Sequence, residues 1–230
     1  MRLILTRTKQ DNARTARALL ALGHETISAP MLTIRTLAPD VPDGGFAGVI
    51  FTSRYAPSRL GPGFTDLPAY CVGAATAAAA KASGFGSAIA GGGTAAALLD
   101  HLSAHPPAGP LLYASAADIA CDLPKALGDR NIACTRIVVY AAVATTSLPE
   151  AARTALNGNT VSGVLLYSAR TANLFGSAVA ASDLASRLET TTAYTLSPKV
   201  AAAAKEAGFW HIITADEPNE SALLATLDGT

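Results

Sequence analysis

Two stretches of the chain decide its fold: Gly48-Val49-Ile50-Phe51-Thr52-Ser53 and, 115 residues further on, Gly163-Val164-Leu165-Leu166-Tyr167-Ser168. Each is a short apolar run that begins with glycine and ends in serine, a pattern that predicts a strand. Self-similarity at this distance indicates an internal repeat, which constrains the architecture of the whole chain.

The repeat continues downstream of both strands. Tyr70-Cys71-Val72-Gly73, the alanine-rich Thr76–Lys81 and Gly84-Phe85 correspond to Tyr194-Thr195-Leu196-Ser197, Val200–Lys205 and Gly208-Phe209, at a constant offset of 124 residues. Short apolar helices around Leu98-Leu99 and Leu223-Leu224 end the two copies. A weaker second pair, residues 3–34 and 111–140, each indicates strand, amphipathic helix, polar turn and strand.

We call the segments 3–34 and 111–140 the A repeats, and the two copies that begin at Gly48 and Gly163 the B repeats. The order along the chain is therefore A, B, A, B, with strands alternating with helices. This spacing predicts an α/β protein with two similar lobes and parallel sheets built from strand–helix–strand crossovers. Which A unit joins which B unit does not follow from the repeat. If the chain crosses between lobes twice, the crossings are expected near residues 36–41 and 140–146, close to Pro39, Pro42 and Pro149.

Composition narrows the function classes. Of 230 residues, 50% are hydrophobic and 15% are charged, and the formal net charge is zero, so no global field indicates a nucleic-acid or membrane-surface binder. The three cysteines, Cys71, Cys121 and Cys134, form no CxxC pair, which argues against a disulfide framework or structural zinc and favours the reducing cytoplasm. No signal peptide and no membrane-spanning run is expected.

Ligands of open parallel sheets bind beyond the carboxyl ends of the strands, where helix N-termini leave N–H groups unpaired. This rule selects small hydroxyl residues, glycine and nearby basic residues as candidate ligand contacts. They are Arg7, Ser53, Arg54, Gly73, Thr76, Ser115, Ser168, Arg170, Ser197 and Lys199. Taken singly, each Ser or Thr also fits an ordinary helix N-cap, and each Arg or Lys a solvated surface charge.

Tyr140 ends the apolar run Ile137-Val138-Val139 and is the candidate hydrogen-bond donor, although a strand tyrosine that covers the edge of a core fits the same pattern. Other signals are weak. His101 and His105 lack a third zinc ligand, and Gly91-Gly92-Gly93-Thr94 lacks the lysine of a phosphate loop and fits a turn with Thr94 as N-cap. No metal and no cofactor is expected.

These features together resemble the uroporphyrinogen-III synthase family over nearly the whole chain. The resemblance is carried by short motifs in a fixed order: Leu5-Thr6-Arg7, Gly23-His24, Val49–Arg54, Val72-Gly73 with Thr76-Ala77, Val138-Val139-Tyr140, Glu217-Pro218 and Leu223-Leu224. It implies two flavodoxin-like lobes joined by a two-stranded connector. Residues 1–35 and 147–230 would form one lobe, residues 42–139 the middle lobe, and residues 36–41 and 140–146 the connector.

The resemblance also implies a reaction. Hydroxymethylbilane, a polycarboxylate bound between the lobes, would lose its terminal hydroxyl as water to give a cationic azafulvene, and closure through a spiro intermediate would invert ring D. The family's tyrosine falls on Tyr140, its serine on Ser53 and its Gly-x-x-Thr threonine on Thr76. The expected partners are this small-molecule substrate and, transiently, hydroxymethylbilane synthase. No nucleic-acid or membrane partner is expected, and the protein is expected to be a monomer.

Two departures from the family pattern bear on the site. Ser197-Pro198-Lys199-Val200 lacks the threonine hydroxyl of the second Gly-x-x-Thr site, and the segment 114–121 lacks the basic residues that many members place there. Two other function classes share the architecture. One is a hinge-closing anion-binding protein, which is commonly exported, and the other is a regulatory module without catalysis.

Overall fold

The computed structural model describes residues 1–227 and divides into two compact units. Unit 1 comprises Met1–Thr33 with Val143–Thr230, and unit 2 comprises Ile34–Ala142. Of the segments expected to form the connector, residues 36–41 and 140–142 fall within unit 2 and residues 143–146 within unit 1. The pairing that the repeat left open is thereby assigned: each unit combines one A repeat with one B repeat.

Unit 1 contains a five-stranded parallel sheet with the order β11-β10-β9-β1-β2. Its strands are β1 (Arg2–Leu5), β2 (Glu25–Ser28), β9 (Gly163–Leu166), β10 (Thr192–Thr195) and β11 (His211–Thr214). Its helices are α1 (Lys9–Ala21), α5 (Glu150–Asn157), α6 (Ala169–Ala180), α7 (Pro198–Glu206) and α8 (Glu220–Ala225), with a 3₁₀ turn η3 (Ala185–Glu189). In chain order within the unit this is the 2-1-3-4-5 order of flavodoxin-like folds.

Unit 2 has the same core arrangement, with the strand order β3-β8-β7-β4-β5-β6. Its strands are β4 (Gly48–Phe51), β5 (Ala69–Cys71), β6 (Ala88–Ala90), β7 (Leu111–Ala116) and β8 (Cys134–Ala144), with β3 (Leu32–Thr36) at the edge. Its helices are α2 (Ala74–Ala82), α3 (Ala95–Ala104) and α4 (Leu123–Gly128), with 3₁₀ turns η1 (Pro57–Arg59) and η2 (Pro62–Phe64). The five parallel strands are a circular permutation of the unit 1 order, because the A repeat here follows the B repeat.

The edge strand β3 runs against β8. Leu37 N–H donates to Val139 O at 2.9 Å, and Thr145 N–H donates to Met31 O at 2.9 Å, so the paired residues run in opposite directions. Strand β8 passes through Tyr140 and continues to Ala144.

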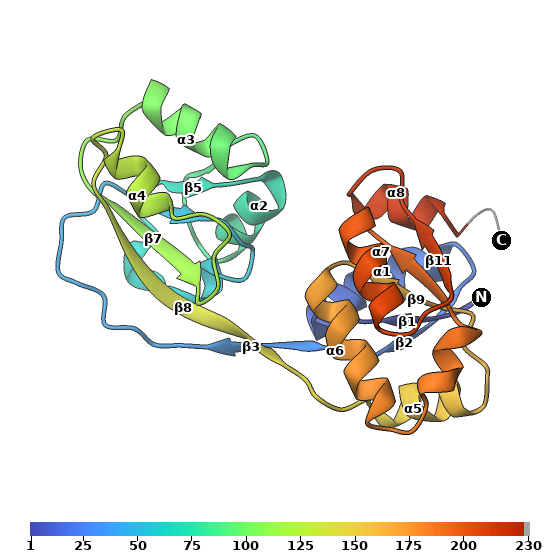
Figure 1. Ribbon diagram of the computed structural model, residues 1–230. Coiled ribbons are helices and arrows are strands. Elements are labelled where there is room, and N and C mark those ends of the chain that lie inside the picture. The colour runs from blue at the N-terminus through green and yellow to red at the C-terminus, as the bar shows by residue number, and fades with distance from the viewer. Residues whose placement is uncertain (228–230) are drawn as a thin grey trace. The chain divides into compact units, whose positions relative to one another are not determined.

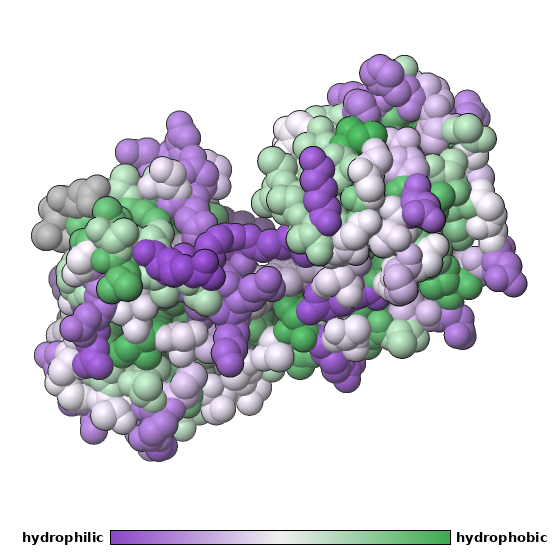
Figure 2. Space-filling model, turned by 180° about the vertical axis from the view of Figure 1, so that it is seen from behind, coloured by the Kyte–Doolittle hydropathy of each residue, from purple (hydrophilic) through white to green (hydrophobic). Residues whose placement is uncertain are grey.

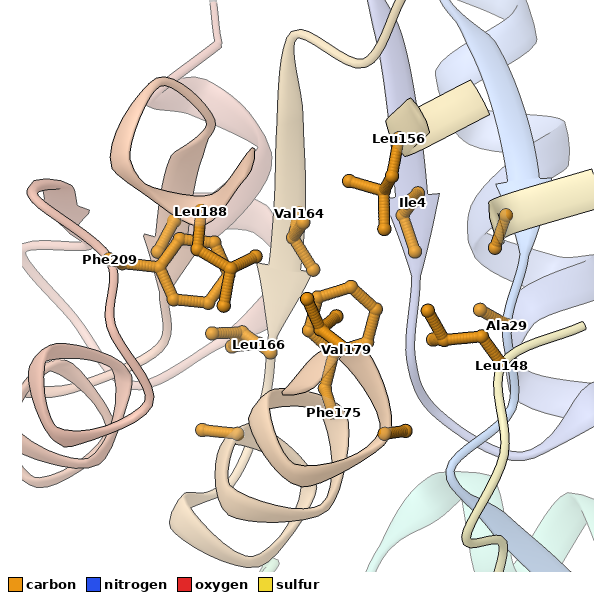
Figure 3. Packing of buried hydrophobic residues seen from close by; sticks show 14 of the residues in the cluster. Ile4, Ala29, Leu148, Leu156, Val164, Leu166, Phe175, Val179, Leu188 and Phe209 are labelled. Carbon is orange, nitrogen blue, oxygen red and sulfur yellow. The ribbon is translucent and has the colours of Figure 1, made fainter. Parts of the chain in front are cut away.

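Helices cover both faces of each sheet (Figure 1). In unit 1, α5, α6 and α7 pack on one face and α1 and α8 on the other. Figure 3 shows Phe175 of α6 directed at the sheet residues Val164 and Leu166, with Leu188 beside Phe209. In unit 2, α2 and η1 cover one face, and α3 and α4 the other. Both faces of the strands are therefore apolar, as expected for parallel sheets.

The repeated Gly-Phe dipeptides end equivalent helices in the same way. Gly84 and Gly208 have φ of +96° and +104°, a left-handed conformation that glycine adopts without strain. Phe85 N–H then donates to Ala80 O, and Phe209 N–H to Ala204 O, each at 3.1 Å. This is a Schellman ending, and it turns each phenylalanine into its core.

Hydrophilic and hydrophobic residues are intermixed in small patches on the face drawn in Figure 2. Among residues 1–227, no helix is long and apolar enough to cross a membrane. The same residues contain no group of three or more His, Cys, Asp or Glu side chains that could hold a metal ion.

Candidate functional site

Unit 2 contains a pocket of about 310 Å³ at the carboxyl ends of its strands. It lies between the segment that follows β4, the N-terminus of α3 and the loop after β7. The lining residues are Thr52, Ser53, Val72, Gly93, Thr94, Ala95, Tyr113, Ala116, Asp118, Ile119, Ala120, Cys121, Leu123 and Tyr140. The pocket therefore brings together two of the predicted site residues, Ser53 and Tyr140.

Tyr140 is held from several sides. Its hydroxyl forms a hydrogen bond with Ser53, and its ring packs edge-on against Tyr55 with the ring centroids 5.9 Å apart. The Arg59 guanidinium lies 5.9 Å from the centroid of the Tyr140 ring and donates to Tyr55 O at 2.5 Å. The side chain is only 5% exposed, so it packs on the core of unit 2 and at the same time lines the pocket.

Burial raises the pKa of Tyr140 above its ordinary value, because the phenolate would lose solvation. The hydrogen bond from Ser53 and the positive charge of Arg59 lower the pKa, but they do not overcome the effect of burial. The phenol is therefore neutral at physiological pH. A neutral phenol can donate a hydrogen bond.

A second phenol lines the pocket, and the sequence did not single it out. Tyr113 comes from β7, is 2% exposed, and shares a hydrogen bond of 3.0 Å with the Thr52 hydroxyl. Burial raises its pKa, although the hydrogen bond to Thr52 and the positive charge of Arg136 lower it. The signal that could have found Tyr113 is its position near the carboxyl end of the strand beside β4, because Ile50 and Tyr113 are paired.

The N-terminus of α3 forms another part of the pocket wall. Thr94 is the N-cap of this helix, as expected, and its hydroxyl accepts a hydrogen bond from Ala97 N–H at 3.1 Å. Gly92 and Gly93 precede it with φ of +81° and +93°. The glycine run is therefore a turn, but one that places Gly93 and Thr94 at the pocket.

Other predicted residues of unit 2 lie outside the pocket lining. Gly73 is the N-cap of α2, and Thr76 is buried in its first turn. Ser115 is 1% exposed and is occupied by the backbone, since its hydroxyl donates to Ile137 O at 3.2 Å and to Ala116 O at 2.9 Å. The guanidinium of Arg54 lies 5.6 Å from the centroid of the Tyr55 ring.

In unit 1 the predicted residue Arg7 belongs to a polar cluster. Its guanidinium lies 4.4 Å from the centroid of the Tyr167 ring, 3.4 Å from a carboxylate oxygen of Glu220 and 3.6 Å from one of Asp11. Arg14 also contacts Glu220, at 3.0 Å. Two carboxylates thus already neutralise the charge that the sequence assigned to an anionic ligand.

Glu220 is the centre of this cluster. Thr15 donates to it at 2.5 Å and Tyr167 at 3.2 Å. Burial raises the pKa of Glu220, but the hydrogen bond from Thr15 and the charges of Arg14 and Arg7 outweigh it, and the pKa lies below its ordinary value. For Tyr167, burial raises the pKa to about 12.

The remaining candidates of unit 1 are at helix N-termini. Ser168 caps α6 by accepting from Thr171 N–H at 3.1 Å, whereas the Ser197 side chain makes no cap bond at the start of α7. Lys199 and Arg170 are exposed in the first turns of α7 and α6. Capping by the side chain therefore holds for Ser168 and not for Ser197.

Comparison with known proteins assigns the chain to a family. A family model described as Uroporphyrinogen-III synthase HemD matches residues 13–225. The structure of uroporphyrinogen-III synthetase from Helicobacter pylori is similar with a TM-score of 0.65 at 18% identity, covering 100% of this chain and 99% of that chain. A mutant uroporphyrinogen III synthase from the extremely thermophilic bacterium Thermus thermophilus gives 0.53 at 17% identity, covering 100% and 98%.

At these identities the structural matches establish the fold, and no curated protein matches the chain. The family model, by contrast, spans most of the sequence, from the first helix to the last one described. The chain belongs to the uroporphyrinogen-III synthase family.

Proposed function

We propose that the pocket of unit 2 is where the terminal hydroxyl of hydroxymethylbilane departs and that Tyr140 donates a hydrogen bond to it. As a family member, the chain is a lyase of tetrapyrrole and heme biosynthesis that acts on a small-molecule tetrapyrrole. The observation that carries the proposal is the buried phenol of Tyr140, bonded to Ser53 at the pocket and kept neutral by its raised pKa.

A hydrogen bond from a neutral phenol stabilises the hydroxyl as it leaves, because negative charge develops on that oxygen when the C–O bond breaks. Tyr140 keeps its proton in this role, so no charged phenolate has to form in a buried site. Hydroxide leaves, and the azafulvene cation that remains is attacked by the substituted carbon of ring D to give a spiro intermediate. The original bond from the bridging carbon to ring D then breaks, and the ring recloses with ring D inverted. The proton that ring D finally loses converts the hydroxide to water, which balances the reaction.

The enzyme's main contribution is positioning, since the free substrate closes without inversion. Holding two reacting groups in one geometry can contribute several kcal/mol. We assign the grip on the substrate's carboxylates to Ser53 and Thr94 at the pocket and, as a prediction, to Gly73, Thr76, Ser168, Ser197 and Lys199 at the helix N-termini. We assign no direct substrate contact to Ser115 and Arg7, because their polar groups are already bonded to protein atoms.

The cellular setting is part of the same proposal. Three free cysteines, of which Cys121 is exposed, fit a reducing cytoplasm. A monomer is supported by the scatter of the large exposed apolar side chains, Leu20, Leu22, Val143 and Trp210, over three separate segments. A transient contact with hydroxymethylbilane synthase remains an expectation from the family.

The test is to supply freshly generated hydroxymethylbilane, oxidise the products and resolve the type I and type III uroporphyrin isomers by chromatography. We expect type III from the wild type and a roughly 10²-fold lower kcat for Tyr140→Phe, the usual effect of removing one such donor. Tyr194→Phe is the matched control, because this buried tyrosine of unit 1 makes only a 3.8 Å contact to the Met1 sulfur.

The outcomes separate two claims. If the wild type gives only type I, as in an enzyme-free control, the synthase function itself is wrong. If the wild type gives type III and Tyr140→Phe keeps the wild-type rate, the function stands and the role of Tyr140 is wrong.

A further inference from the structure

Arg136 is the most heavily bonded basic side chain beside the pocket, and neither the sequence nor the proposed reaction assigns it a role. It lies in β8 opposite Tyr113 of β7. Its Nε donates to the Ser115 hydroxyl, and its Nη2 donates to Ala116 O and Ala117 O, each at 2.8 Å. One guanidinium therefore holds three consecutive residues at the end of β7.

These bonds lie where the regular sheet pairing breaks. The register of β7 and β8 shifts between Ser115 and Ala116, so that Ala116 is paired with Tyr140 and Val139 is skipped. Ala117 N–H then donates to Tyr140 O at 2.8 Å. At such a bulge the regular ladder of backbone hydrogen bonds is locally interrupted. Arg136 supplies the donors for Ala116 and Ala117.

The segment that Arg136 holds continues directly into the pocket wall. Ala116 and residues 118–121 line the pocket, and Tyr140 lines it from the neighbouring strand. We propose that Arg136 is a positioning residue for the family's reaction: by bridging the bulge, it fixes the 116–121 wall against the backbone that carries Tyr140. The role of Arg136 in the reaction rests on the proposed function of the pocket, whereas its bridging of the bulge does not.

The proposal explains a departure from the family pattern. The segment 114–121 carries no Lys or Arg of its own. Its basic group comes instead from the adjacent strand and is bonded to backbone carbonyls rather than pointed at a ligand. The arrangement also requires arginine, because a planar fork can donate from Nε and Nη2 at once, whereas a lysine ammonium is a single point donor.

The experiment compares Arg136→Lys and Arg136→Gln with the matched control Arg130→Gln. Arg130 also donates to a backbone carbonyl, Ala126 O, at 2.8 Å, but it is exposed and lies outside the pocket lining. For each purified full-length protein, KM and kcat are measured with freshly generated hydroxymethylbilane. Hydrogen–deuterium exchange is followed by mass spectrometry on peptides that cover residues 114–123.

We expect both Arg136 variants to raise KM by about tenfold or more, the effect of one lost charge-assisted hydrogen bond, with kcat changed less than about threefold. Exchange should rise in residues 114–123 and stay unchanged in the peptides of unit 1. Arg130→Gln should match the wild type in both measurements.

Three results would overturn the inference: an unchanged KM, a Lys variant equal to the wild type, or an exchange increase spread over the whole chain, which would mark a merely structural role. Deuterium exchange needs no substrate, so it tests the positioning even if the wild type yields only type I product. A wild type that yields type III while Arg136 variants behave normally would leave the synthase function intact and remove Arg136 from it.

Discussion

The substitution Gly163→Ala tests the packing that makes the two repeats alike. Gly163 begins β9 beneath the ring of Tyr194, which is 2% exposed. A Cβ at this position would lie 2.4 Å from Tyr194 Cε2, 2.9 Å from its Cδ2 and 3.0 Å from Thr192 O. The ring is enclosed by the core and the carbonyl belongs to the adjacent strand, so neither neighbour can move away cheaply.

The expected cost follows from these contacts. Overpacking a tight core costs about 1–3 kcal/mol, and three contacts at or below 3.0 Å place this site at the upper end. Replacing a strand glycine by alanine returns roughly 0.5–1 kcal/mol of backbone entropy. We therefore expect a net loss of about 2 kcal/mol in the free energy of unfolding.

The equivalent substitution in unit 2 is the matched comparison. A Cβ at Gly48 would lie 2.6 Å from Tyr70 Cε2, 3.0 Å from Pro68 O and 3.2 Å from Leu111 Cδ2. Tyr70 is only half-buried, so its ring can tilt toward solvent. We expect Gly48→Ala to cost about 1 kcal/mol, less than Gly163→Ala.

Urea unfolding followed by far-UV circular dichroism measures both variants. A loss of about 2 kcal/mol would also lower Tm by roughly 4–8 °C in a chain of this size. The reasoning fails if Gly163→Ala is as stable as the wild type, or if Gly48→Ala turns out to be the more damaging of the two.

Two further predictions concern the polar groups of each unit. Tyr113→Phe should lower kcat/KM by about tenfold, because it removes the partner of the Thr52 hydroxyl at the pocket; a wild-type value in steady-state kinetics would take Tyr113 out of the site. Glu220→Gln should be less stable than the wild type at pH 7. The lowered pKa of Glu220 means that its ionised form stabilises the fold above about 4.5, its ordinary value, and that this contribution is lost as the pH falls through the folded-state pKa. The difference in urea midpoint between Glu220→Gln and the wild type should therefore disappear at acid pH. A difference that stays constant from pH 7 to pH 3 would show that the charge of Glu220 is irrelevant.

The sequence predicted the fold class well because the repeat carries local signals that tertiary structure did not override. Gly84-Phe85 and Gly208-Phe209 end equivalent helices as their residue types indicate. The repeat alone left the pairing of A and B repeats open, since either assignment buries the same apolar strands. Only the family resemblance placed both ends of the chain in one lobe, and in unit 1 the strand β1 does pair with β9.

The candidate site was predicted in part, and the misses have a common cause. The rule that ligands bind at the carboxyl ends of strands selected Ser53, which lines the pocket, but also Ser115, which does not. Tyr140, which also lines the pocket, was selected as the end of an apolar run and by the family resemblance. Whether a side chain faces a pocket depends on the local register, and the register shift after Ser115 leaves no mark in the sequence. Arg136 escaped notice for the same reason, because its bonds depend on that irregularity.

The repeat also shows why one unit has a pocket at this place while the other has a polar cluster. Asn219 caps α8 as Thr94 caps α3, so Glu220 stands where unit 2 has the small pocket residue Ala95. In the repeated strand segments Gly48–Ser53 and Gly163–Ser168, Tyr167 occupies the position of Thr52. These two larger side chains are hydrogen-bonded to each other and both contact Arg7, and they occupy in unit 1 the positions at which unit 2 has small residues. We therefore assign the leaving-group chemistry to unit 2, and Glu220 and Tyr167 to the stability of unit 1.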